Sequence, residues 1–254
     1  MDTDELTYGS YLRVPELLAL QRPRSRPPHP EELHFIVVHQ ALELWLKLLL
    51  HDLGRIVEFL DADDHPRSLA LLGRVNHTLS HALEQMRSLH TLAPWDLHQF
   101  RSYLGTASGS QSVQFRELEF VSGAKDPAYL RRFRGLTAAE QERLQRRLAE
   151  PSLWDAFIAV LTDAGFKVDT PEDRVVALRE VAYDRARYGA IWDLAEALVE
   201  HDALFARWRA RHVLMVERQI GTKSGTGGSS GAPYLRNRLD LRFYPELWEL
   251  RSQL

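Results

Sequence analysis

Apolar residues recur at helical spacing through almost the whole chain, and this periodicity most limits its possible folds. In residues 31–60 an apolar stripe advances in alternating steps of four and three residues: Phe35, His39, Leu42, Leu46, Leu49 and Leu53. Pro30 precedes this run, and the stretch 61–66 ends it. No region alternates with the period of two typical of strands over more than a few residues. We therefore predict a single-domain all-α helical bundle.

The same pattern predicts several further helices and one connecting segment. Helices are expected over residues 68–92, 95–120 (interrupted at 105–110), 137–150, 152–163 and 192–220, with two helical runs after Pro171 that lead into the last of these. Ser or Thr stands at the start of the two shorter helices, as an N-cap requires. The proline-rich residues 22–30 read as an extended connection. This divides the chain into an N-terminal segment, 1–30, and a helical domain, 31–254.

Composition excludes several classes of protein. The formal net charge of −3 over 254 residues leaves no basic excess for a nucleic-acid partner. The absence of cysteine excludes disulfides, thiolate nucleophiles, cysteine-ligated zinc and iron–sulfur clusters. Residues 1–12 lack the apolar core of a signal peptide, and no uncharged apolar run approaches the roughly 18 residues of a membrane span. We expect a cytoplasmic protein with no membrane partner.

Two of the eleven histidines lie on apolar helix faces. His39 belongs to the stripe in residues 31–60, and His212 shares a face with Phe205, Trp208 and Met215. A single histidine on such a face is most often a hydrogen-bonded core residue. Two such helices facing each other would instead form a haem slot, with one imidazole as iron ligand and the other opposite it. Spacing in the sequence does not distinguish these alternatives.

Other features have both a structural and a functional interpretation. The loop 221–231 is rich in Gly, Ser and Thr, which suits a flexible linker or a lid over a small ligand. Arg101 is either an exposed charge or the partner of a carboxylate. The mixed basic and aromatic run 205–211 is interpreted as an ordinary helix with a charged outer face. Tyr8 and Tyr11 lie on one side of the N-terminal segment and form a packing anchor, within the chain or on a neighbouring subunit.

Four segments of the chain together resemble the tryptophan 2,3-dioxygenase family, in the order that the family has them. They are residues 6–12 (LTYGSYL), 35–47 (FIVVHQALELWLK), 100–120 with its QSVQFR core, and 208–231, which runs from WRARH to GTGGSSG. The resemblance implies an all-α enzyme, typically a homotetramer, that encloses haem b (iron protoporphyrin IX). It implies oxidation of L-tryptophan by O2 to N-formylkynurenine.

The resemblance also implies roles for individual residues. His212 matches the proximal iron ligand, and His39 matches the distal histidine that hydrogen-bonds the indole N–H. Phe35 matches a ring that packs against the indole. Arg101 matches the partner of the substrate carboxylate, and Thr226 matches a contact to the amino-acid end of the substrate.

Further pocket positions follow from the same resemblance. Leu104 and Ser108 match residues that line the substrate pocket. The N-terminal segment of the family reaches into a neighbouring subunit, so Tyr8, Tyr11 and Leu12 are expected to line that subunit's pocket.

Two positions depart from the family pattern and bear on the substrate. Ser110 stands where the family commonly has Phe, and Leu97 stands where an aromatic residue is usual. These departures keep open an alternative reaction: mono-oxygenation of tryptophan or a methylated tryptophan to an oxindole in natural-product biosynthesis. A third hypothesis is a haem-binding or tryptophan-sensing protein that does not catalyse a reaction.

Overall fold

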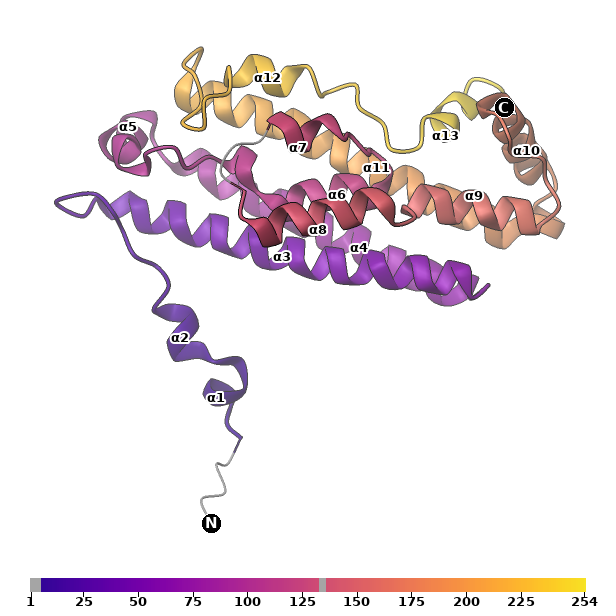
Figure 1. Cartoon of the computed structure of the whole chain (residues 1–254), viewed down its shortest axis with the longest axis horizontal. Helices are drawn as coiled ribbons and strands as arrows, with labels where there is room; N and C mark the ends of the chain where they lie inside the picture. Colours follow the sequence, from indigo (N-terminus) through magenta and orange to yellow (C-terminus); the bar gives the residue numbers. More distant parts are fainter. Residues whose placement is uncertain (1–5, 133–135) are drawn as a thin grey trace.

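The computed structural model describes residues 6–132 and 136–254, and no strand occurs among them. Its long helices lie side by side along the long axis of the molecule (Figure 1). Helix α4 (His65–Gln85) packs against both α3 (Pro30–Asp61) and α11 (Arg185–Ile220). Helices α6 (Val113–Ser122) and α9 (Leu153–Asp163) cover another side of α3. The predicted all-α single domain is confirmed.

Helix α3 forms where the apolar periodicity predicts it. His29 caps its first turn by accepting from Glu31 N–H, and Pro30 occupies the first helical position, where its missing N–H costs nothing. Leu46, Leu49 and Leu53 of the stripe lie buried in the core. By length and composition α3 is the one described helix that could cross a membrane, and the core helix of a globular bundle passes the same test. Its stripe packs against α4, α6 and α9, whereas Leu33, Val37 and Leu44 on its other faces are exposed.

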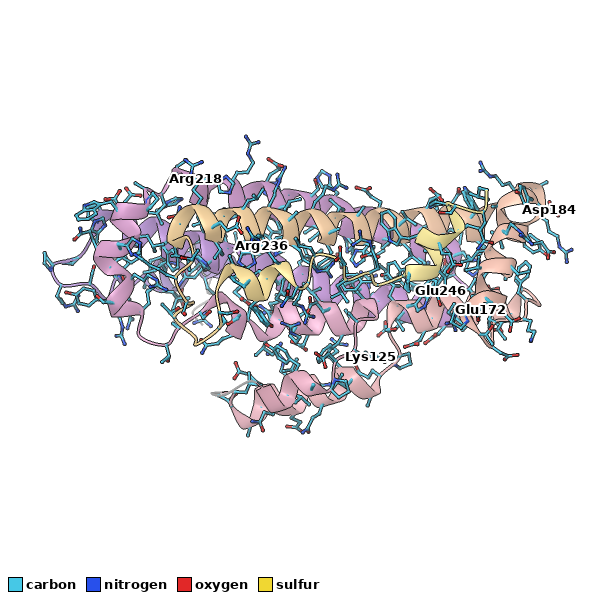
Figure 2. All side chains as sticks on the ribbon, turned by 90° about the horizontal axis from the view of Figure 1, so that it is seen from above. Lys125, Glu172, Asp184, Arg218, Arg236 and Glu246 are labelled. Carbon is cyan, nitrogen blue, oxygen red and sulfur yellow. The ribbon has the colours of Figure 1, made fainter. Side chains whose placement is uncertain are left out.

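Helix α11 is the other long element that positions the site. It begins at a cap from the Asp184 side chain, bends at Tyr188, whose backbone is non-helical, and ends at Gly221, where φ is +59°. Phe205 and Trp208 on its inner face are buried in the core. Arg218 projects outward from the same helix (Figure 2), as an amphipathic helix requires.

Local capping signals decide several of the remaining boundaries. Thr137 and Ser152 both form reciprocal capping boxes, so these two predicted N-caps are confirmed. The helix predicted over 68–92 instead begins at His65, because Asp64 caps it and Pro66 lies in its first turn. It ends at Gln85 and continues as a 3-10 turn. The other elements are α5 (Pro94–Phe100), α7 (Ala128–Arg132), α8 (Ala138–Ala149), α10 (Pro171–Tyr183), α12 (Ala232–Arg236), α13 (Pro245–Leu250) and the 3-10 turns Met86–Thr91, Arg101–Leu104 and Gly109–Gln111.

The N-terminal segment stands away from the bundle. Helices α1 (Tyr8–Leu12) and α2 (Val14–Leu18) contain no buried residue and project from the body of the molecule (Figure 1). The side chains of Tyr8 and Tyr11 are 79% and 69% exposed. The prediction that these two rings pack within their own chain is therefore wrong. That they pack on a neighbouring subunit stays a prediction.

Candidate active site

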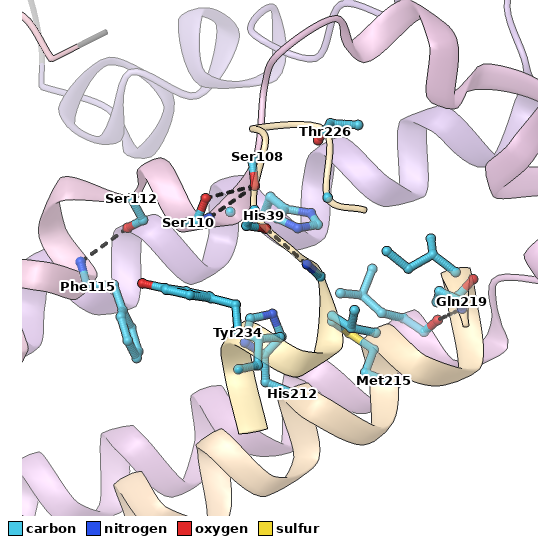
Figure 3. Close-up of a pocket in the computed structure, with 18 of the residues that line it drawn as sticks. His39, Ser108, Ser110, Ser112, Phe115, His212, Met215, Gln219, Thr226 and Tyr234 are labelled. Atoms are coloured by element: carbon cyan, nitrogen blue, oxygen red, sulfur yellow. Dashed lines mark hydrogen bonds between the residues drawn. The ribbon is translucent and has the colours of Figure 1, made fainter. Parts of the chain in front are cut away.

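One apolar cavity of about 240 Å³ lies between α3, α5, α11 and the glycine-rich loop that follows α11. Helices α4 and α5 both contact α3 and α11, which brings the two histidine-bearing helices to opposite walls of this space. Figure 3 shows His39 and His212 directed into it. The cavity wall contains seven of the ten residues to which the resemblance assigns a role in the site: Phe35, His39, Arg101, Leu104, Ser108, His212 and Thr226.

The imidazole of His212 is uncharged at neutral pH. Burial, with a smaller contribution from the nearby His39, lowers the pKa of His212 from 6.5 to about 4. In the described part of the chain, no residue hydrogen-bonds to its ring. A neutral imidazole with an available lone pair in an apolar cavity is suited to bind a metal.

The hydrogen bonding of His39 determines which of its ring nitrogens can accept. His39 Nδ1 lies 2.7 Å from the backbone oxygen of Phe35, one turn earlier on α3. A carbonyl oxygen can only accept, so Nδ1 carries the proton and Nε2 keeps its lone pair. Burial lowers the pKa of His39 and keeps the ring neutral. The Phe35 ring packs against it, with ring centroids 4.2 Å apart.

The glycine-rich loop 221–231 closes one side of the cavity. Arg101 Nη2 donates to Ser224 O at 2.5 Å, and Thr226 Oγ1 donates to Ala107 O. Gly227 approaches the 105–110 segment so closely that a Cβ there would lie 2.7 Å from Ser108 Cβ. The loop therefore packs against the cavity wall, which favours a lid over a free linker.

Both positions that depart from the family pattern face the cavity. Ser110 Oγ lies 3.0 Å from Ser108 Oγ, and either hydroxyl can donate (Figure 3). Leu97 is buried beside Leu92 and Phe100 in a small apolar cluster. Ser112, two residues after Ser110, caps α6 by accepting from Phe115 N–H at 3.1 Å. A small polar surface thus stands where the family pattern has Phe.

Sequence reasoning missed the charged part of the cavity wall, which contains Arg116, Glu119, Arg209 and Arg238. For Arg209 the prediction of a charged outer helix face is wrong, because its side chain is only 6% exposed. Arg209 lies three residues before His212 and hence on the same helix face. That spacing was the available signal, but an arginine on a helix is exposed far more often than buried.

Three predicted residues lie outside this cavity. Tyr8, Tyr11 and Leu12 are on the projecting N-terminal segment and do not line the pocket of their own chain. Their role in the pocket of another subunit stays a prediction.

Comparison with known proteins agrees with the geometry of the site. A sequence profile described as Tryptophan 2,3-dioxygenase matches residues 1–172 and 174–254. The tryptophan 2,3-dioxygenase of Nocardioides sp. is 54% identical over 98% of this chain and 95% of its own length. Those of Herpetosiphon aurantiacus and Myxococcus xanthus are 42% and 41% identical, each over 98% of this chain, and the chain covers 98% and 89% of their lengths. Since the profile and these relatives span nearly the whole sequence, this chain belongs to the tryptophan 2,3-dioxygenase family.

Proposed function

We propose that this enzyme uses haem b to cleave the indole C2–C3 bond of L-tryptophan with O2, giving N-formylkynurenine. The observation that carries the proposal is the pair of neutral imidazoles, His39 and His212, which enter one apolar cavity from two helices. Family membership supports the same reaction.

The residues of the cavity fit a haem group. His212 offers an uncharged imidazole nitrogen as iron ligand, and buried guanidinium nitrogens without hydrogen-bond partners lie one turn away, at Arg209. The rest of the cavity wall is largely apolar and includes Trp208, Met215 and Val216. When bound, haem supplies the iron centre that activates O2.

The protein's own task is to bind and orient the indole. With Nδ1 of His39 donating to Phe35 O, His39 Nε2 is the acceptor for the indole N–H. Phe35 packs against the indole ring, and Leu104 and Ser108 line the same pocket. Holding the reacting atoms in one geometry removes much of the entropic barrier.

The amino-acid end of the substrate has its own partners. The guanidinium of Arg101 pairs with the carboxylate, and Thr226 contacts the same end of the molecule. Because Arg101 also donates to Ser224 O, substrate binding and loop closure share one side chain. Closure of the loop excludes water from the reacting centre.

The assembly that fits this site is a homotetramer in which residues 1–30 of one subunit enter the pocket of another. The exposed apolar surface of Tyr8, Tyr11 and Leu12 supports this arrangement, since exposed apolar clusters mark interaction surfaces. Mixing Tyr11→Ala subunits with Arg101→Ala subunits tests it. In a mixed oligomer, the intact N-terminal segment of an Arg101→Ala subunit can enter the intact cavity of a Tyr11→Ala subunit. Reassembled mixtures should therefore recover activity that neither parent has. No recovery in verified hetero-oligomers would refute the sharing of sites.

The mass of the product tests the reaction itself. Ferrous, haem-loaded protein is given L-tryptophan and labelled O2, and two labelled oxygen atoms in the product are expected. One labelled atom would replace the proposal with mono-oxygenation, and saturable binding without oxygen consumption would replace it with sensing.

The iron ligand is tested separately by its spectrum. His212→Ala should lose the Soret band of the ligated haem, whereas His77→Ala, an exposed histidine on α4, should keep it. Identical spectra for the two variants would show that another group binds the iron.

A further inference from the structure

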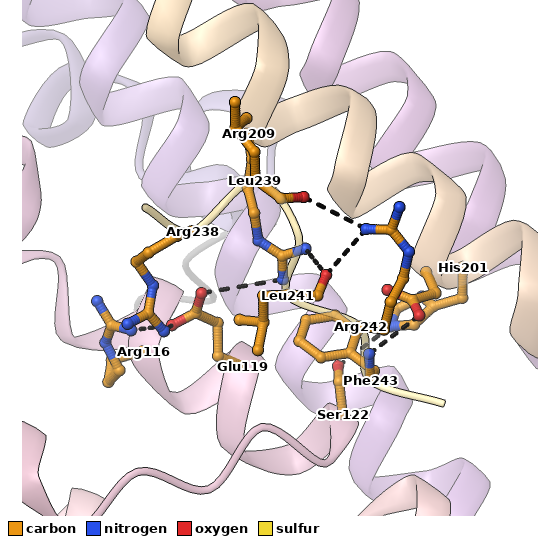
Figure 4. A network of polar contacts seen from close by, with 11 residues as sticks. Arg116, Glu119, Ser122, His201, Arg209, Arg238, Leu239, Leu241, Arg242 and Phe243 are labelled. Carbon is orange, nitrogen blue, oxygen red and sulfur yellow. Dashed lines mark hydrogen bonds and ion pairs between the residues drawn. The ribbon is translucent and has the colours of Figure 1, made fainter. Parts of the chain in front are cut away.

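Three arginines and one glutamate of the cavity wall meet where α6, α11 and the segment after α12 come together (Figure 4). Glu119 is hydrogen-bonded by Arg116, and its oxygens lie 3.3 Å from Arg238 Nη2 and 4.0 Å from Arg209 Nη2. We call these four residues the arginine cluster. Arg116 and Arg209 are each 6% exposed, and Glu119 is more deeply buried still.

The arginine cluster has two more positive charges than negative ones. Three guanidinium groups face the single carboxylate of Glu119. Two further charges act on Arg209, but Asp202 raises its pKa and Arg242 lowers it, so their charges offset each other. Burial and the neighbouring guanidiniums lower the pKa of Arg209 to about 10, with Asp202 acting against them. Buried charge is costly unless it is paired. The cavity wall therefore has the character of an anion site.

Unpaired donors are present at the same place. Arg209 Nε and Nη2, Arg116 Nε and Arg238 Nε are buried and have no hydrogen-bond partner within the described residues. Buried donors of this kind normally have a partner, so each calls for an acceptor. Carboxylate groups accept from guanidinium groups and offset their charge.

The arginine cluster lies beside His212, the candidate iron ligand, and not beside Arg101, the candidate partner of the substrate carboxylate. Arg209 precedes His212 by one turn of α11, whereas Arg101 belongs to the turn after α5. Iron protoporphyrin IX has two carboxylates, and two negative charges balance the excess of two. A single amino-acid carboxylate would leave one charge uncompensated.

Arg238 links this cluster to the segment that carries the substrate loop. We call residues 221–244 the strap. Thr226 attaches the strap to Ala107, Arg238 attaches it to Glu119, and Phe243 N–H donates to Asp202 Oδ2 at 2.9 Å. The middle attachment lies in the arginine cluster.

We propose that the arginine cluster binds the two carboxylates of the cofactor, and that Arg238 thereby couples cofactor binding to the ordering of the strap. This inference rests on the proposed haem enzyme. A second acceptor for Arg238 would hold the strap, and with it the loop containing Thr226, more firmly in its closed position.

The first test compares protohaem with its dimethyl ester, which has the same ring but no free carboxylate. Haem loss to an excess of apomyoglobin is measured for wild-type protein and for Arg238→Gln. A lost charge-assisted bond should accelerate protohaem loss about tenfold or more, while loss of the ester should change little. Arg236→Gln is the matched control, because Arg236 on α12 is largely exposed (Figure 2) and pairs with Glu217 of α11 rather than with the arginine cluster. It should behave as wild type.

Equal acceleration of protohaem and ester loss in Arg238→Gln would overturn the proposal. So would wild-type protein that holds the ester as tightly as protohaem. Arg238 is the most exposed arginine of the cluster, so its replacement threatens folding least. If Arg238→Gln does not fold, Arg238→Lys keeps the charge and should give a smaller acceleration with the same dependence on the ligand.

The second test measures the strap directly. Lys223 is exposed in the glycine-rich loop and is one of only four lysines, so a lysine-specific protease reports on this loop. Protohaem should slow cleavage at Lys223 in wild-type protein but not in Arg238→Gln. Equal protection in both proteins would overturn the coupling. A wild-type protein that binds no haem would instead refute the proposed function itself. Failure of the coupling and failure of the proposed function thus give different results.

Discussion

Gly227→Ala should selectively disfavour the closed position of the glycine-rich loop. The new Cβ would lie 2.7 Å from Ser108 Cβ, a distance that real contacts of this kind essentially never show. Ser108 Cβ is attached directly to the backbone, so rotation of a side chain does not relieve the clash. Overpacking of this type costs about 1–3 kcal/mol, which corresponds to roughly a fivefold to more than a hundredfold loss in the closed population.

Steady-state oxygen consumption measures the consequence. In the proposed complex, Thr226 of the closed loop and Arg101, which donates to Ser224 O of that loop, contact the substrate. We therefore expect KM for L-tryptophan to rise by this factor. The Soret spectrum should stay unchanged, because His212, the proposed iron ligand, does not contact Gly227. Gly73→Ala is the control, because Gly73 lies on α4 outside the cavity wall and a Cβ there meets nothing within 4 Å. If Gly227→Ala kept the wild-type KM, the loop would not close over the substrate in the position described.

Three further predictions follow from the same contacts. Arg101→Gln should raise KM for L-tryptophan by about tenfold or more through loss of a charge-assisted pair, and an unchanged KM would refute its role. Asp202→Ala should destabilise the fold by roughly 2–4 kcal/mol, measured by urea unfolding, because buried Asp202 accepts from Phe243 N and Trp248 Nε1. The apoprotein should also be less stable at pH 5 than at pH 7. Burial lowers the pKa of His201 to about 3 and is the main reason that the pKa of His212 is about 4, so between these values and 6.5 only the unfolded chain binds the protons. The loss at pH 5 is about 2 kcal/mol for each histidine, and equal stability at both pH values would contradict it.

Local features of the fold were predictable from the sequence. The stripe through Leu46, Leu49 and Leu53 and the capping boxes at Thr137 and Ser152 depend on residues within one or two turns of each other. Pro66 shows the limit of such reasoning, because the sequence pattern predicts that it ends one helix, whereas it lies in the first turn of the next. Proline is compatible with both positions, so the cap from Asp64 decided the boundary.

Arg209 shows why the charged wall of the cavity was not predicted. Residue type assigns an arginine to the surface, and only the meeting of α6, α11 and the strap makes this one buried. Its partners Glu119 and Arg238 are distant in the sequence. No periodicity within α11 carries information about them.

The sequence by itself determined the helical class, the chemical groups available and the helix face on which each histidine lies, because these depend on residue type and local spacing. Only the tertiary structure decided that His39 and His212 share a cavity. Their helices are far apart in the chain and are brought together through their packing on α4 and α5. Burial in that shared space then lowers the pKa values of both histidines. Both imidazoles are therefore neutral, as the proposed binding of iron by His212 and of the indole N–H by His39 requires.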